Sequence, residues 1–78
     1  MPTILRTKGY RFFFYSNDHH PPHVHIERGR CTAKFLLEDV KLIRSKRFNA
    51  SELNDIRKII LNNTESLKAK WDEHFTNF

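Results

Sequence analysis

The histidines are the residues of this chain whose type and spacing could do chemistry. Four of the five histidines fall within seven positions, at His19, His20, His23 and His25. An imidazole titrates near neutral pH, binds metal ions, exchanges protons and hydrogen-bonds to phosphate. The segment from Asp18 to His25 is therefore the first candidate for a functional site, and each use of imidazole predicts a different partner.

Metal binding is one interpretation of this segment. His23 and His25 are two positions apart, so on a strand both side chains leave the same face and could ligate one ion. Either Glu27 or His20 could supply a third ligand. Three protein ligands with one open position are typical of a catalytic metal site. No established zinc spacing is present, and the main prediction includes no metal and no cofactor.

Ribonuclease chemistry is a second interpretation. One imidazole can take the proton from a 2′-hydroxyl, another can protonate the leaving oxygen, and a lysine can stabilise the charged phosphorane. The catalytic candidates are His23, His25 and Lys34, with Arg11 on the same face. Such a site needs neither a metal ion nor a deep pocket.

Binding of nucleic acid without chemistry is a third interpretation, with RNA as the favoured ligand. Cationic side chains contact phosphates, and aromatic rings stack on bases. The candidate residues for this contact are Arg11, Tyr15, His23, His25, Lys34, Arg44, Lys46 and Arg47. A fourth interpretation leaves the cluster inert, with Asp18 and His19 capping a turn and the strand histidines facing solvent.

Length and charge limit these choices. The chain has 78 residues and a net charge of +5. This length predicts a single domain over residues 1–78 with a modest core, and it excludes a large enzyme with an internal cofactor cavity. Residues 1–47 hold 10 basic and 4 acidic residues, so an anionic partner is expected on that part. A lone cysteine excludes an intrachain disulfide, and without a signal peptide or membrane-length apolar run we expect a cytoplasmic protein.

Residues 3–43 are predicted to form a small antiparallel sheet of three to five strands. The expected strands are 4–6, 10–15, 23–27 and 31–37, with a short strand or irregular edge at 40–43 and a turn-rich loop over 16–22. Gly29 is the first central residue of a two-residue loop, which favours a type II′ hairpin. The resulting register pairs Arg28 with Cys31, Glu27 with Thr32, Ile26 with Ala33, His25 with Lys34 and Val24 with Phe35.

Both faces of the predicted strand 10–15 are aromatic. Tyr10, Phe12 and Phe14 lie on one face, and Phe13 and Tyr15 lie on the other. Only one face can pack against a helix, so we expect the other to be covered by a second copy, a neighbouring protein or a base, or to stay exposed. A non-enzymatic interaction module, homodimeric or bound to a partner, is therefore an alternative function.

Residues 49–76 switch to a helical period. Asn49 and Glu52 are placed as a capping box. One apolar stripe runs through the segment, formed by Leu53, Ile56, Ile59, Ile60, Leu67, Trp71 and Phe75. The unbroken stripe favours one long helix bent at 62–64 over a pair of helices with Thr64 as the cap of the second. Either arrangement covers one face of the sheet and gives an α+β fold.

Several segments of the chain resemble the small bacterial proteins of domain-of-unknown-function family 4160. The resemblance covers nearly the whole chain, and the residues that carry it are Met1-Pro2-Thr3-Ile4, the stretch from Gly9 to Asn17, Pro21-Pro22-His23-Val24-His25, Leu53, Ile56 and Trp71. It implies a stand-alone bacterial domain, often encoded beside another small protein, with His23 and His25 as functional positions. The chain departs from the family pattern at His20, where an acidic or amide residue is expected.

The paired genes that the resemblance implies suggest a toxin–antitoxin-like pair, and the charge of the chain predicts that it is the small basic component of one. We expect it to bind nucleic acid through the sheet face that carries the histidines, and to be a candidate metal-independent ribonuclease. The alternatives are the interaction module and a metal-binding protein that uses His23, His25 and Glu27.

Overall fold

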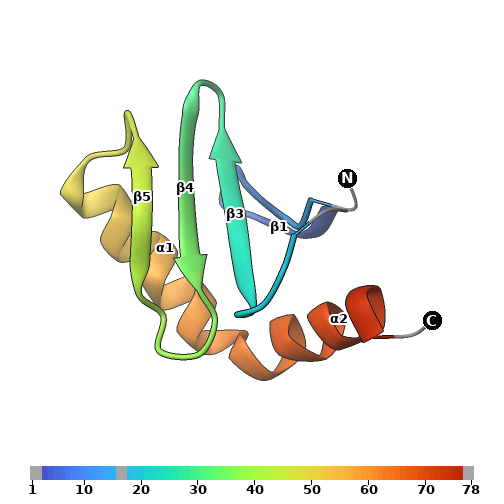
Figure 1. The fold of residues 1–78 in the computed structure, drawn as a ribbon. Helices are drawn as coiled ribbons and strands as arrows, with labels where there is room; N and C mark the ends of the chain where they lie inside the picture. Colours follow the sequence, from blue (N-terminus) through green and yellow to red (C-terminus); the bar gives the residue numbers. More distant parts are fainter. Residues whose placement is uncertain (1–2, 16–17, 77–78) are drawn as a thin grey trace.

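The computed structural model describes residues 3–15 and 18–76 and shows a five-stranded antiparallel sheet followed by two helices (Figure 1). The elements are β1 (Thr3–Thr7), β2 (Tyr10–Phe13), β3 (His23–Arg28), β4 (Cys31–Leu36), β5 (Leu42–Lys46), α1 (Ala50–Asn62) and α2 (Thr64–Thr76). The strands are ordered in the sheet as they are in the chain. In Figure 1, α1 passes behind β4 and β5, and α2 runs beyond the end of the sheet. The predicted α+β fold is confirmed.

Two tight turns set the strand register. Lys8 and Gly9 both have positive φ, 52° and 84°, which is the conformation of a type I′ turn between β1 and β2. Gly29 has a φ of 61°, as the first central residue of a type II′ turn requires. The β3–β4 register is the predicted one, with Val24 opposite Phe35 and His25 opposite Lys34. The hairpin prediction is therefore confirmed.

The core lies between the sheet and the helices. Its largest fully buried side chains come from both layers: Trp71, Phe12, Phe14, Phe35, Ile26, Leu37, Ile56, Ile60, Leu67 and Val24. Phe14 and Trp71 meet edge to face, with ring centroids 5.2 Å apart. The helical stripe is thus part of the core, as its spacing predicts.

The helical segment divides into two helices at Asn63, so the preference for one long helix is wrong. The capping box of α1 is present, with Glu52 N–H donating to Asn49 and the Glu52 side chain accepting from the Asn49 N–H. At the other end, Asn63 Nδ2 donates to Ile59 O and the Thr64 hydroxyl donates to Ile60 O. These side chains take the last carbonyls of α1, and the helix ends there. Thr64 therefore bonds back to α1 instead of capping α2.

Two strand boundaries differ from the predicted ones. Strand β2 ends at Phe13, which is its last residue paired with β1 or β3, instead of at Tyr15. Strand β5 covers Leu42–Lys46 instead of 40–43, since Val40 takes a positive φ of 49° and the Leu36 N–H bonds to Lys41 O across the preceding turn. The predicted turn at Ser16 and Asn17 lies outside the described residues.

Neighbouring positions on α1 provide a test of this packing. Ile60 is fully buried, whereas Leu61 is 55% exposed. We expect Ile60→Ala to lower the free energy of unfolding by about 2–5 kcal/mol, because it leaves a cavity in the core. Leu61→Ala should change it by less than about 0.5 kcal/mol. Urea unfolding measures both, and equal losses would contradict the orientation of α1.

Candidate functional site

The face of the sheet opposite the helices carries most of the predicted site residues and is called the open face here. Residues paired across strands share a face, so the register defines two rows. One row contains Phe13, His25, Lys34 and Arg44, and the other contains Arg11, Glu27, Thr32 and Lys46. A hollow of about 460 Å³ lies between them, with Tyr15 at its side.

Phe13 is covered by side chains of the open face itself. The Arg11 guanidinium lies 4.1 Å from the centre of the Phe13 ring, and the His25 ring stacks on it at 5.5 Å. Tyr15 meets the same ring edge-on at 5.2 Å. Phe13 is consequently only 3% exposed, whereas Tyr15 is 40% exposed. No second molecule is needed to bury Phe13. Tyr15 is the aromatic side chain of this face that a ligand could contact.

The cations of the open face differ in their partners. Arg11 is held by Glu27, with Nη2 and Oε1 2.9 Å apart, so these two charges compensate each other. Lys34, Arg44 and Lys46 line the hollow and have no acidic partner within residues 3–15 and 18–76. These three residues therefore give the hollow a net positive charge. Arg47 is exposed just after β5, with a φ of 71°, and does not line the hollow.

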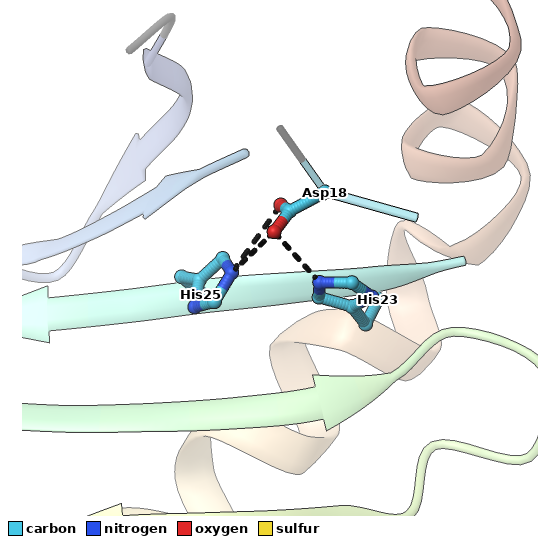
Figure 2. A group of neighbouring side chains, drawn as sticks. All are labelled: Asp18, His23 and His25. Atoms are coloured by element: carbon cyan, nitrogen blue, oxygen red, sulfur yellow. Dashed lines mark hydrogen bonds and ion pairs between the residues drawn. The ribbon is translucent and has the colours of Figure 1, made fainter. Parts of the chain in front are cut away.

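A carboxylate joins the two strand histidines at the edge of this face (Figure 2). Asp18 Oδ1 lies 3.0 Å from His23 Nε2, and His25 Nε2 lies 3.3 Å from both Asp18 oxygens. The Tyr15 N–H donates to Asp18 Oδ2 at 2.9 Å, which orients the carboxylate toward the rings. Asp18, His23 and His25 are called the Asp–His cluster below.

The tautomer of His23 follows from its other nitrogen. Nδ1 lies 3.0 Å from the Pro21 carbonyl oxygen, which can only accept, so Nδ1 carries the proton. In the neutral ring, Nε2 is then a lone pair that faces the Asp18 carboxylate. Despite the 3.0 Å distance, this buried Nε2 has no aligned hydrogen bond to any described residue. A proton or a cation between the two atoms would relieve their repulsion.

The same environment shifts two pKa values. Burial, helped by the charges of His23 and Lys34, lowers the pKa of His25 below 6.5 and outweighs the effect of Asp18. Burial alone would raise the pKa of Asp18, but the Tyr15 N–H and the two imidazoles together bring it below 3.8. The cluster thus favours an ionised Asp18 beside an uncharged His25.

The third group beside the histidine pair is Asp18, not Glu27. The Glu27 carboxylate is taken by Arg11, and the His20 ring lies 5.8 Å from the Trp71 ring, outside the cluster. Among the described residues, Asp18, His23 and His25 place one ligand atom each within 4.8 Å of one another, so these three could hold a metal. The feature of the sequence that could have indicated Asp18 is its position shortly before the Pro21-Pro22 pair, directly after which β3 begins.

The predicted catalytic residues lie close to one another but differ in their exposure to solvent. His23 is 6% exposed and directs both nitrogens at protein atoms. His25 and Lys34 are opposite each other on β3 and β4 and line the hollow. Lys34 also lines a second hollow of about 390 Å³ beside Asp18 and His23.

Comparison with known protein families matches residues 9–72 to the Domain of unknown function (DUF4160). The chain belongs to this family. The match to DUF4160 includes the Asp–His cluster and all the cations of the open face. No curated protein and no solved structure matches the chain. Neither described helix of this DUF4160 protein has the length and apolar character needed to cross a membrane.

The lowered pKa of His25 predicts how stability depends on pH. The folded state binds a proton at His25 less readily than the unfolded state, so the stabilisation is present above pH 6.5 and is lost as pH falls. We expect the free energy of unfolding of chelator-treated protein to fall between about pH 7.5 and about pH 5. Urea unfolding should show a smaller fall in His25→Gln.

The control for this measurement is His74→Gln, because His74 is exposed on α2. This variant should keep the pH dependence of the wild type. A wild-type stability that is constant or increases over the same range would contradict the uncharged state of His25.

Proposed function

We propose that this protein binds single-stranded nucleic acid, with RNA favoured, on the open face. The observation that carries the proposal is the hollow lined by Lys34, Arg44 and Lys46, which have no acidic partner among the described residues. Cations that protein carboxylates do not neutralise are available to phosphates, and they release counterions when they bind them.

The aromatic content of the open face supports a single strand over a duplex. Tyr15 is 40% exposed at the side of the hollow, where an unpaired base can stack on its ring. Sheet faces with exposed aromatic side chains bind splayed bases of RNA in a comparable way. The major groove of duplex DNA admits an α-helix or a two-stranded β-ribbon, whereas the basic hollow here lies across β3, β4 and β5 of a wider sheet.

The proposal concerns binding. Cleavage by His23, His25 and Lys34 stays a prediction, and the geometry offers it little support. An acid–base pair must reach the 2′-hydroxyl and the leaving oxygen of one phosphate. His23 is buried against Asp18 and Pro21 O, and His25 points Nε2 at the same carboxylate. Both rings thus direct a nitrogen at Asp18, and His23 has no nitrogen directed into the hollow.

A cytoplasmic role within a toxin–antitoxin-like pair is part of the same proposal. A small basic face suits a nucleic-acid target in such a pair. The support for a pair is the family resemblance, which implies a stand-alone domain encoded beside another small protein, and this association does not by itself determine an activity.

Charge removal on the open face tests the proposal. The triple variant Lys34→Ala, Arg44→Ala, Lys46→Ala should bind a labelled RNA of about 12 nucleotides about tenfold more weakly or worse at low salt. The slope of log affinity against log salt should fall by about 2, because three phosphate contacts are lost. Fluorescence anisotropy measures both, and the RNA is run on a gel afterwards to detect cleavage.

The matched control removes three exposed cations from the helices, in Arg57→Ala, Lys58→Ala, Lys70→Ala. This variant has the same net charge as the first and should bind RNA like the wild type, apart from a small general effect of charge. Equal losses in the two variants, or no binding by the wild type, would refute an RNA site on the open face.

A further inference from the structure

The Asp–His cluster contains three metal-ligating side chains that the proposed function does not use as ligands. Their ligand atoms lie within 4.8 Å of one another, and two of the three separations are 3.0 and 3.3 Å. Zinc–nitrogen bonds of about 2.0–2.1 Å place neighbouring ligand atoms of a tetrahedral site roughly 3.3 Å apart. The separations between these ligand atoms are therefore close to those that a bound ion requires.

The state of His23 supports a cation at this position. Its Nε2 is buried, has no aligned hydrogen bond within the described chain, and faces a carboxylate oxygen at 3.0 Å. Because Nδ1 donates to Pro21 O, the neutral ring presents a lone pair to that oxygen. Two electron-pair donors at this distance are the arrangement that a metal ion bridges.

Outer hydrogen bonds orient the ligands as they do in known metal sites. A ligating histidine commonly donates its other N–H to a carbonyl, and His23 does so through Pro21 O. A ligating carboxylate is commonly fixed by a further hydrogen bond, and Asp18 accepts one from the Tyr15 N–H. These bonds leave Nε2 of His23 and Oδ1 of Asp18 directed inward.

We infer that Asp18, His23 and His25 bind one divalent transition-metal ion of the zinc class. Two imidazoles and one carboxylate favour such an ion over magnesium or calcium, which prefer oxygen ligands. Three protein ligands leave a coordination position free. The hollow lined by Asp18, His23 and Lys34 lies beside the cluster and provides room for water or an anion there.

The inference is independent of nucleic-acid binding and is tested without RNA. Isothermal titration of tag-free, metal-free protein with Zn²⁺ should show one site per chain. Asp18→Asn and His25→Gln should each weaken Zn²⁺ binding by more than the roughly 10–100-fold that the loss of an outer hydrogen bond causes. Asp18→Asn keeps an acceptor for the Tyr15 N–H, and circular dichroism checks that each variant is folded.

The matched controls are histidines outside the cluster. His20→Gln removes a ring that lies next to Trp71, and His74→Gln removes one on α2. Both should bind Zn²⁺ like the wild type. Co²⁺ added in place of Zn²⁺ should give visible absorption bands of a four-coordinate site in the wild type and not in Asp18→Asn.

Three results would overturn the inference. The first is that the wild type binds Zn²⁺ no more tightly than Asp18→Asn does. The second is that His20→Gln loses as much Zn²⁺ affinity as His25→Gln. The third is that folded His25→Gln protein keeps the Co²⁺ spectrum of the wild type. The first would show that Asp18 is not a ligand of the ion. The other two would place the ion on surface histidines.

Discussion

The pairing of β3 with β4 is the constraint on which the rest of the structure depends. The Gly29-Arg30 turn sets the register, and each cross-strand pair places both residues on one face. Val24 meets Phe35 in the core, while His25 meets Lys34 on the open face. A slip of one residue would expose the apolar side chains and turn the histidines toward the helices. Core and site are therefore determined by the same hydrogen-bond ladder.

His23 connects the helical layer to the open face. It is the first residue of β3, its ring lies 5.2 Å from the Trp71 ring of α2, and its Nε2 lies 3.0 Å from Asp18. Packing against Trp71 contributes to the burial of the ring. In this low-dielectric setting an unpaired Nε2 beside a carboxylate is costly unless a proton or a cation lies between the two atoms.

Local rules explain which elements were predictable. The capping box at Asn49 and the turn at Gly29 depend on residues within a few positions, so both could be predicted. The break at Asn63 was missed because the apolar stripe continues across it, while the amide and hydroxyl side chains compete for the carbonyls of α1. The position of β5 depends on the positive φ of Val40, which its residue type disfavours.

Residue types and spacing alone determined that His23, His25 and Lys34 share a face, because strand alternation and a two-residue turn are local properties. Only the tertiary structure decided which acid meets the histidines. Glu27 lies on the same face of β3 as the two histidines, but its charge is neutralised by Arg11 on the neighbouring strand. Asp18 lies outside the strands, so strand alternation cannot place it, yet its Oδ1 lies 3.0 Å from His23 Nε2. The physical reason is that a carboxylate contacts the polar group that lies nearest to it in space, and that distance is a property of the folded chain.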